Sequence, residues 1–480
     1  MSYKVEAVSE QKAVSYKLEA VSGVAGKHQP YSEYKESGVK WLGEIPVSWT
    51  MNKLSHAYDS IGSGTTPPST EEKWYQGDIP WVTTGELRES VIYETSKCVS
   101  GEALTQFSVL RTYPAGSIVM AMYGATIGRV GILGVSATTN QACCVFPESK
   151  ILNNKYLYYW LQAFREDIIR LSSGGGQPNI NQEKVASLKV SAPSSEHQRT
   201  IAAFLDYETA RIDALIAKQQ RLIELLKEKR QAVISHAVTK GLNPNVPMKD
   251  SGVEWLGQVP AHWEVCRLKH HIISMEQGWS PQCEARLAEE GEYGVLKVGC
   301  VNGGVFRPQE HKALPGTISP KKEYSLKKGQ LLISRANTRE LVGSAAVVDQ
   351  DYSNLLLCDK LYRLKFSEEV QPEFISYLLG SPLYRSQIEL SASGASDSMQ
   401  NIGQSSIREL PVALPPLKEV VDILSHMSSS LIKFNMLHEQ LETQALLLSE
   451  RRTALISAAV TGKIDVRGWQ PPAEAEHAYS

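Results

Sequence analysis

The chain has 480 residues, of which 42% are hydrophobic and 21% are charged, values that are ordinary for a folded globular protein. They exclude a largely disordered chain, and at about 100–200 residues per domain the length predicts two to four domains. The 50 Lys and Arg against 52 Asp and Glu give a formal net charge of −2. Because nucleic-acid-binding domains usually carry a basic excess, DNA binding would need basic groups concentrated on one face or a partner that supplies much of the field.

An N-terminal extension and a first α+β domain begin the chain. Residues 1–30 contain a small local duplication, in which SYKVEAVS is followed by SYKLEAVS. Residues 31–193 are the first expected domain. They open on SGVKWLGEIPVSW at 37–49 and continue in short β-like runs such as Ile118–Met122, bounded by Gly, Pro and Asn. A helix is predicted over Lys155–Leu171.

A long helix follows at 194–241, and the same organisation then repeats. Gly241 and Pro244 are typical terminators of such a helix. A second α+β domain is expected over 242–415, a second long helix over 416–462 and a C-terminal tail over 463–480, polar and mobile after Arg467. In the second domain, β-like runs are predicted at Val295–Val298, Leu331–Ser334 and Ala345–Val348, and a helical segment at Pro372–Leu390.

The two units share their beginnings and their ends but not their interiors. SGVKWLGEIPVSW at 37–49 recurs as SGVEWLGQVPAHW at 251–263, an offset of 214 residues. EKRQAVISHAVT at 228–239 recurs as ERRTALISAAVT at 450–461, an offset of 222 residues. Identity in matched places indicates a pseudo-two-fold internal repeat. Divergent interiors on shared frames favour two different working faces, although loop drift in a duplicated structural domain is the alternative.

Apolar residues recur along both long helices with the 3–4 alternation of a heptad. A narrow apolar seam needs a covering surface, so the two helices most simply pack against each other. In a repeat with the order domain, helix, domain, helix, a two-fold relation requires the helices to run antiparallel. The alternative is that each helix packs only on its own domain. The predicted seam consists of Ile201, Leu205, Ile212, Leu215, Leu222, Leu226 and Val233 with Ile423, Met427, Phe434, Leu437, Leu441, Leu448 and Leu455.

Further apolar residues flank this predicted seam. They make the apolar stripe wider than one helix partner needs, which leaves room for another subunit. The expected partner-binding residues are Ile216, Ile223, Leu225, Leu446 and Leu447.

Signatures of catalysis, metal binding and membrane insertion are absent from the sequence. It lacks the P-loop motif, H-E-x-x-H, G-x-S-x-G, a run of ~18 apolar residues and the apolar region of a signal peptide. The seven cysteines show no C-x-x-C spacing, and Cys143-Cys144 lies in an apolar run that favours core packing. His270 and His271 could bind a metal, but nothing nearby in sequence completes a site, so we interpret them as surface histidines. We therefore expect a reduced, cytoplasmic, non-catalytic chain without a metal site.

The loops of the two domains carry residue types that suit DNA. Hydroxyl groups can donate to phosphates or bases, Lys suits phosphates, and in the major groove Arg matches guanine and Asn matches adenine. Polar loops with solvated side chains are common, however, and the Asn179/Asn401 pair could be structural because it recurs where the loops differ. The candidates are Thr65, Thr66, Thr83, Thr84, Tyr123, Thr126, Arg129, Gln177 and Asn179 in the first domain, and Lys297, Asn302, Lys321, Lys322, Arg335, Asn337, Arg339, Gln400 and Asn401 in the second.

The repeated motifs carry a family resemblance. SGVKWLGEIPVSW after Tyr34-Lys35, and MKDSGVEWLGQVPAHW after Asn245, resemble the domain-opening motif of type I restriction–modification specificity subunits. EKRQAVISHAVTKG and ERRTALISAAVTGKID resemble the ends of that family's conserved helices. The resemblance covers residues 31–466 and keeps the family's order twice.

The resemblance implies that each α+β domain is a target recognition domain for one half of a bipartite, asymmetric double-stranded DNA sequence. The two helices would form an antiparallel coiled coil that sets the half-site spacing and docks two modification subunits. Those subunits would bind S-adenosylmethionine and methylate adenine, and restriction subunits would use ATP and magnesium to translocate and cut DNA. This chain would have no catalysis and no cofactor of its own.

A protein of another class remains the alternative, namely a duplicated coiled-coil scaffold that holds partner proteins without DNA readout. Two divergent loop sets on matched frames favour the DNA-reading interpretation, because a scaffold has no need of them.

Overall fold

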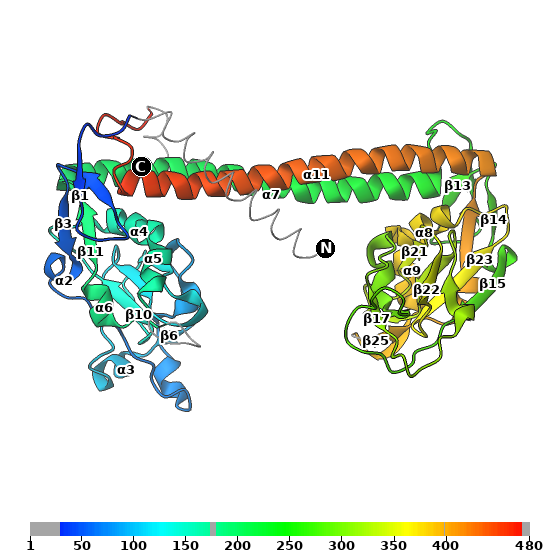
Figure 1. Ribbon diagram of the computed structural model, residues 1–480, viewed down its shortest axis with the longest axis horizontal. Helices are drawn as coiled ribbons and strands as arrows, with labels where there is room; N and C mark the ends of the chain where they lie inside the picture. Colours follow the sequence, from blue (N-terminus) through cyan, green and yellow to red (C-terminus); the bar gives the residue numbers. More distant parts are fainter. Residues whose placement is uncertain (1–28, 173–178, 398, 473–480) are drawn as a thin grey trace. The chain divides into compact units, whose positions relative to one another are not determined.

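The computed structural model describes residues 29–172, 179–397 and 399–472, so the N-terminal duplication and Gln177 lie outside the described residues. The chain divides into two compact units (Figure 1). Unit 1 contains the residues up to Gln220 and those from Glu442 onward, and unit 2 is Arg221–Leu441. Each unit therefore holds one α+β domain and a segment of each long helix.

The opening motif of each repeat folds as a hairpin. In unit 1, β1 (Tyr34–Glu36) pairs antiparallel with β2 (Glu44–Pro46), and in unit 2, β12 (Met248–Asp250) pairs with β13 (Gln258–Pro260). Gly43 and Gly257 occupy the left-handed region with φ of 67° and 62°, which explains why glycine recurs there. Trp49 and Trp263, which end the motif, are completely buried.

The sheets of unit 1 are short and pack around separate apolar clusters. A four-stranded sheet has the order β10-β7-β8-β5, a three-stranded sheet the order β6-β4-β9, and β3 pairs with β11. The strands are β3 (Thr50–Lys53), β4 (Ile79–Val82), β5 (Val91–Ile92), β6 (Cys98–Val99), β7 (Ile118–Ala121), β8 (Val130–Leu133), β9 (Thr138–Thr139), β10 (Cys143–Phe146) and β11 (Lys189–Ala192), and the helices are α2 (Leu54–Ala57), α3 (Gly101–Gln106), α4 (Asn154–Ala163), α5 (Arg165–Arg170) and α6 (Gln182–Ala186).

Unit 2 has a related plan with additional strands. Its sheets have the orders β15-β23-β19-β21, β17-β16-β22-β18 and β20-β25-β24, and β14 pairs with β26 as β3 pairs with β11. The strands are β14 (Glu264–Arg267), β15 (Ile272–Gln277), β16 (Gly294–Leu296), β17 (His311–Ala313), β18 (Ser325–Leu326), β19 (Leu331–Ser334), β20 (Ala336–Asn337), β21 (Ala345–Val347), β22 (Tyr352–Leu356), β23 (Leu361–Phe366), β24 (Ser393–Ser396), β25 (Met399–Asn401) and β26 (Pro411–Leu414), and the helices are α8 (Pro372–Gly380), α9 (Pro382–Ser391) and α10 (Gln404–Arg408).

Both predicted domain helices are present but interrupted. Pro382 cannot continue the helix that precedes it, so the segment predicted over Pro372–Leu390 divides into α8 and α9. The segment predicted over Lys155–Leu171 divides at Phe164 into α4 and α5. Cys143 and Cys144 are fully buried in β10, which confirms their predicted core packing. Burial raises the pKa of both thiols.

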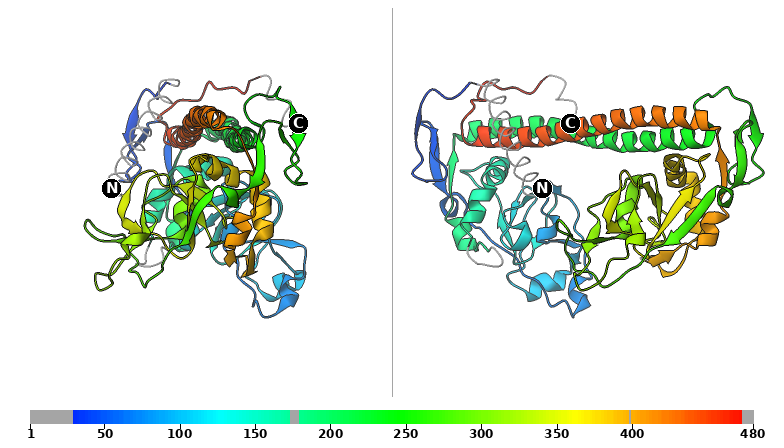
Figure 2. Two further views of the ribbon diagram at one scale, coloured as in Figure 1. Left: turned by 90° about the vertical axis from the view of Figure 1, so that its right-hand side faces the viewer. Right: turned by 45° about the vertical axis from the view of Figure 1, so that its right-hand side comes forward.

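The two long helices are α7 (Ser195–Lys240) and α11 (Leu417–Val460), and each ends at the predicted glycine, Gly241 or Gly462. Their segments lie side by side in each unit and run antiparallel (Figures 1 and 2). In unit 1, Gln219 Nε2 donates a hydrogen bond to Gln444 Oε1 at 3.0 Å. Asp213 lies nearer the start of α7, and Arg452 lies nearer the end of α11. Arg452 Nε is 2.8 Å from Asp213 Oδ1. This confirms the antiparallel coiled coil.

The detailed seam assignment was wrong at several positions. Leu215, Leu222 and Leu437 were predicted to be in the seam but are 43%, 42% and 48% exposed. Ile216 and Ile223, predicted to flank the seam, are half-buried on the inner side of α7. Adjacent apolar residues at 215–216 and 222–223 both satisfy a 3–4 alternation, so the sequence alone did not decide which of them faces inward.

The helix ends explain why the two repeated motifs occur as a pair. In unit 1, Gly462 at the end of α11 lies against Trp49 of the opening motif, and Tyr34 Oη donates to the Gly462 carbonyl at 2.9 Å. In unit 2, Gly241 at the end of α7 lies 3.4 Å, measured from an ideal Cβ, from the ring of Trp263. Each opening motif therefore packs on a helix end of its own unit.

The first residues of the expected C-terminal tail are packed, including Trp469, which was expected to be mobile. Ile464 and Val466 are buried in unit 1, and the Trp469 ring contacts Phe204 and Tyr207 of α7. The Asp465 N–H also donates to the Gln29 carbonyl at 2.7 Å. Across the described residues, no helix is both long enough and apolar enough to cross a membrane.

Candidate nucleic-acid interface

The two α+β domains present one backbone frame at matched strand ends. At the end of β7, the Ile180 N–H donates to the Met122 carbonyl at 3.0 Å. At the end of β19, the Ile402 N–H donates to the Arg335 carbonyl at 2.9 Å. Ile180 and Ile402 are both buried, so each anchors the segment after it to its own core.

The asparagine before each isoleucine belongs to the same frame. Tyr123 and Asn179 form an antiparallel β-bridge in unit 1, and Ala336 pairs with Asn401 in unit 2. Asn179 and Asn401 thus occupy the same structural position, which gives their recurrence a structural explanation.

The side chains on these matched frames differ in chemistry. In each unit, the residue at the strand end also donates a backbone hydrogen bond at 2.8 Å, from the Met122 N–H to the Ala142 carbonyl and from the Arg335 N–H to the Lys360 carbonyl. Each acceptor lies directly before the neighbouring strand, β10 or β23. These bonds align the two units residue by residue. The matched positions are Met122 with Arg335, Tyr123 with Ala336, Gln141 with Asp359 and Ala142 with Lys360.

In unit 2, several predicted residues lie together at the end of β19. We call this surface the strand-end face of unit 2, and it contains Arg335, Asn337, Asn302, Gln400 and Asp359. Arg335 Nη1 donates to the Asp359 carbonyl at 3.3 Å. Asn337 Nδ2 donates to Asn302 Oδ1 at 3.1 Å, and Asn337 is paired in register with Gln400. All five side chains are partly exposed. This places amide, guanidinium and carboxylate groups on one surface, at β20 and β25. Figure 1 labels β25.

Lys321 joins the same face through residues that the sequence did not indicate. Its Nζ lies 5.0 Å from the centre of the Trp279 ring, a cation–π distance. The next residue, Ser280, donates a hydrogen bond to Asp359. Trp279 is partly exposed, and it was missed because it is more than 50 residues from Arg335 in sequence.

The strand-end face of unit 1 is less charged. Thr66 Oγ1 donates to Gln141 Oε1 at 2.6 Å, and Gln141 precedes Ala142 at the strand end. Tyr123 is exposed, and Thr126 Oγ1 donates to its carbonyl at 3.4 Å. Gln141, which the sequence reasoning also missed, lies between Thr66 and the strand end. The face therefore offers hydroxyl and amide groups where unit 2 offers a guanidinium.

Several other candidates are held by partners inside their own unit. The Thr83 N–H donates to Glu86 at 2.8 Å in a capping box, and Arg129 forms a bidentate pair with Glu89 that raises the pKa of the guanidinium. Partners of this kind favour a structural role over contact with DNA. Similar pairs join Lys297 to Glu310 at 3.6 Å and Arg339 to Asp397 at 3.8 Å.

The remaining candidates, Thr65, Thr84 and Lys322, lie outside the strand-end contacts described above. Thr65 and Thr84 are half-buried, and Lys322 is exposed in a 3-10 helix. The Thr65 carbonyl accepts a hydrogen bond from Trp81 Nε1 at 3.2 Å, so its backbone at least supports the loop.

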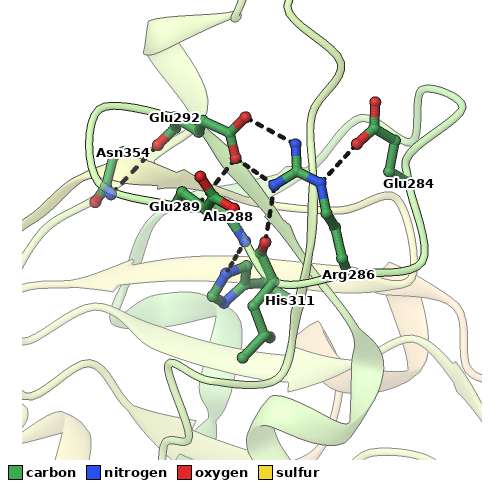
Figure 3. Close-up of polar contacts among 8 residues, drawn as sticks. Glu284, Arg286, Ala288, Glu289, Glu292, His311 and Asn354 are labelled. Carbon is green, nitrogen blue, oxygen red and sulfur yellow. Dashed lines mark hydrogen bonds and ion pairs between the residues drawn. The ribbon is translucent and has the colours of Figure 1, made fainter. Parts of the chain in front are cut away.

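Two glutamates near β17 form ion pairs with another basic residue of unit 2, Arg286 (Figure 3). Arg286 pairs with Glu284 at 2.8 Å and with Glu292 at 2.5 Å, and these hydrogen bonds lower the pKa of Glu292 to about 2. His311 Nε2 accepts the Ala288 N–H at 3.0 Å, so Nδ1 carries the proton that it donates to the Pro308 carbonyl. Arg286 is therefore engaged in ordering its loop.

The expected partner-binding residues fall into two groups. Leu225 and Leu446 are 42% and 49% exposed, so they offer apolar surface to another molecule. Ile216, Ile223 and Leu447 are half-buried within the chain. Leu215 and Leu222, predicted for the seam, belong with the exposed group.

A family model described as "Type I restriction modification DNA specificity domain" matches the chain twice, at residues 46–225 and 260–446. The two matches cover most of the chain and coincide with its internal repeat. The chain belongs to this family. It is therefore a DNA-specificity component of a type I restriction–modification system, with two recognition domains.

Curated relatives and solved structures agree with this membership. The chain is 23% identical to the EcoKI specificity subunit of Escherichia coli (strain K12), over 88% of this chain and 90% of that protein. It is 30% identical to the Escherichia coli EcoEI specificity subunit, but that match spans only 42% of this chain and 34% of the relative. The fold resembles a type I R-M system chain, with TM-score 0.68, 15% identity and coverage of 88% and 99%. It also resembles the HsdS subunit from Thermoanaerobacter tengcongensis, with TM-score 0.52, 15% identity and coverage of 88% and 98%.

Proposed function

We propose that each recognition domain reads one half of a bipartite, asymmetric double-stranded DNA target through its strand-end face. The observation that carries the proposal is the matched frame with unmatched side chains. Met122 and Arg335 share one backbone position, as do Gln141 and Asp359, yet their chemistry differs. Direct readout depends on the donors and acceptors that a side chain offers, so the two faces would specify different sequences.

The finer roles of the chain and its partners follow from this proposal. The long helices would dock two modification subunits through their exposed leucines, such as Leu225 and Leu446, and set the spacing between half-sites. S-adenosylmethionine would belong to the modification subunits, and ATP and magnesium to the restriction subunits. The chain itself would supply specificity without catalysis. Contacts between the partner subunits and DNA would also add affinity, because this chain has a net charge of −2 and no basic excess of its own.

A scaffold without DNA readout is the competing function. It would need the coiled coil and the exposed leucines but not two different polar faces. The DNA-specificity family and the divergent strand-end faces both favour readout.

Domain exchange provides the test. The Leu54 N–H donates to the Leu188 carbonyl at 3.0 Å, and the Leu268 N–H donates to the Leu410 carbonyl at 3.0 Å. Exchange of residues 54–188 for the same part of another family member would keep the β3–β11 pair and the two long helices, α7 and α11, intact. With a modification subunit present, methylome sequencing should show one altered half-site, and the matched exchange of 268–410 should alter the other.

Two outcomes would contradict the proposal. If either exchange changed both half-sites, the domains would not read independently. If a folded exchange variant methylated the original sequence, the exchanged domain would not read DNA at all.

A further inference from the structure

A cluster of potential metal ligands lies at the base of unit 2, away from the strand-end face. Glu264 and Cys266 are on β14, and His271 directly follows the short 3-10 helix Leu268–His270 that comes after this strand. A carboxylate oxygen of Glu264, the Cys266 sulfur and a ring nitrogen of His271 all lie within 4.8 Å of one another. The sequence did not indicate this cluster, because alternate residues of a strand and a histidine beyond it show no metal-binding spacing.

The local backbone brings these three residues together. Glu264 and Cys266 are two positions apart on one strand, so their side chains point to the same face of it. β14 pairs with β26, which leads directly into α11. The His271 carbonyl accepts the Ser367 N–H at 2.9 Å, which holds the histidine backbone in place.

The His271 ring has an unsatisfied nitrogen. Its side chain is 11% exposed, and Nδ1 lies 3.5 Å from Glu369 Oε2. Nε2 is buried and has no hydrogen-bond partner. A buried ring nitrogen without a partner is costly, and a cation would satisfy it. A carboxylate on the opposite ring nitrogen is also the usual arrangement for a metal-bound histidine.

Unit 1 offers an internal comparison at the same place. Leu54 and Leu268 make equivalent backbone hydrogen bonds directly after β3 and β14, so the two strands align residue by residue. The positions of Glu264, Cys266 and His271 are taken in unit 1 by Thr50, Asn52 and Ala57. There the Asn52 Nδ2 donates to Thr50 Oγ1 at 3.1 Å, and no ligand set forms from these three residues.

We propose that Glu264, Cys266 and His271 bind a divalent transition-metal cation, with Glu369 positioning the His271 ring. Thiolate, imidazole and carboxylate together favour zinc over magnesium or calcium. Three protein ligands leave a fourth position for water. The ion would fasten β14 to the segment after it, at the base of the domain. This proposal does not depend on how the domain reads DNA.

Cobalt provides the first probe. The full chain, freed of metal with a chelator, is titrated with Co²⁺ and followed by absorption. The expected result is a saturable thiolate-to-cobalt charge-transfer band at one equivalent, which Zn²⁺ then abolishes by displacement. Cys266→Ser and His271→Gln should lose the band. The matched controls Cys283→Ser and His270→Gln should keep it, because these neighbours lie outside the cluster.

A second measurement on the unaltered chain covers the possibility that a variant folds poorly. Zn²⁺ should protect Cys266 from a thiol-alkylating reagent, with Cys283 and Cys98 unprotected, as read by peptide mass spectrometry. Glu369→Gln should weaken Zn²⁺ binding about 10–100-fold in chelator competition. No cobalt band in the unaltered chain, an undiminished band in a folded Cys266→Ser variant, or no protection of Cys266 would each overturn the proposal.

Discussion

At the scale of single residues, the residues that hold the matched frames are separate from those proposed to read DNA. Ile180 and Ile402 are buried and make the same backbone hydrogen bond, so they hold the frame. Met122 and Arg335 sit at the carbonyl that accepts this bond, but one is buried and the other is partly exposed. A position that keeps its backbone while its side chain changes can alter specificity without altering the fold.

Arg335 is the residue where this separation is most directly tested. If its guanidinium grips a base bidentately, Arg335→Ala should cost about 1–3 kcal/mol and relax only the second domain's half-site. Methylation of near-cognate sites, read by methylome sequencing, measures the effect. Arg339→Ala is the comparison, because this exposed side chain lies beside Asp397 and should at most weaken binding uniformly. Unchanged specificity in Arg335→Ala would assign Arg335 to phosphate contact or support.

The internal repeat, the two α+β domains and the two long helices could be predicted from the sequence. The grouping of side chains at the strand ends could not. Arg335 and Asn337 were predicted as DNA contacts because they follow a strand, and Asn401 because it lies in the loop that matches GGGQPNINQ; these contacts stay predictions. Trp279 and Gln141 were not predicted, because only the folded chain brings them to the strand ends. Thr83 and Arg129 have suitable chemistry, but Glu86 and Glu89 engage them. His271 was assigned to the surface because its neighbours in the cluster are not its neighbours in sequence.

At the scale of elements, local signals defined the helix ends better than the helix faces. Gly241 and Gly462 end α7 and α11 as predicted, because a left-handed residue there needs glycine. The heptad seam was correct at Ile212 and Leu455, but it was wrong at Leu215, where an apolar neighbour faces inward instead.

Gly462 tests the junction between helix end and opening motif. Its φ is 70°, and a Cβ there would collide with the Pro46 ring. Gly462→Ala should therefore destabilise unit 1 by at least about 1–2 kcal/mol, the usual cost of the left-handed conformation. Gly468→Ala is the matched control, because nothing lies within 4 Å of its Cβ position and its φ is not left-handed. Denaturant unfolding of both variants checks this, and equal midpoints would contradict the assigned role.

The exposed leucines of the long helices test the docking of partners. Leu225→Glu and Leu446→Glu should each weaken binding of a modification subunit by about 10-fold or more, equivalent to about 1.4 kcal/mol, because a charge would enter an apolar interface. The stability of the chain alone should not change, since both side chains are exposed. Gln440→Glu adds the same charge at an exposed polar position and should bind normally. Normal binding by both leucine variants would remove these residues from the interface.

At the scale of the whole molecule, the helices would determine the distance between half-sites. An insertion near Thr239 is unsuitable as a test, because Val238 and Thr239 are buried and Gly241 meets Trp263. One heptad inserted after Gln220 and another after Leu441 would keep the antiparallel pairing and lengthen both helices by about 10 Å.

We expect this double insertion to widen the gap between unchanged half-sites by about three base pairs, at ~3.4 Å each. Methylome sequencing gives the gap directly. A single insertion, in α7 alone, serves as the control and should lose activity because the two helices no longer match. An unchanged gap in an active double variant would separate the helices from spacing.

The closure of unit 1 by the end of α11 also has a consequence for how the protein is made. Unit 2 is one continuous stretch, Arg221–Leu441, whereas unit 1 needs the residues from Glu442 onward. Tyr156 Oη, for example, donates to the Val460 carbonyl at 3.3 Å inside the unit 1 core. On the ribosome, the domain that emerges first would therefore be completed last. A chain released at residue 441 should hold a protease-resistant unit 2 beside a protease-sensitive first domain, and equal resistance of both domains would contradict this order.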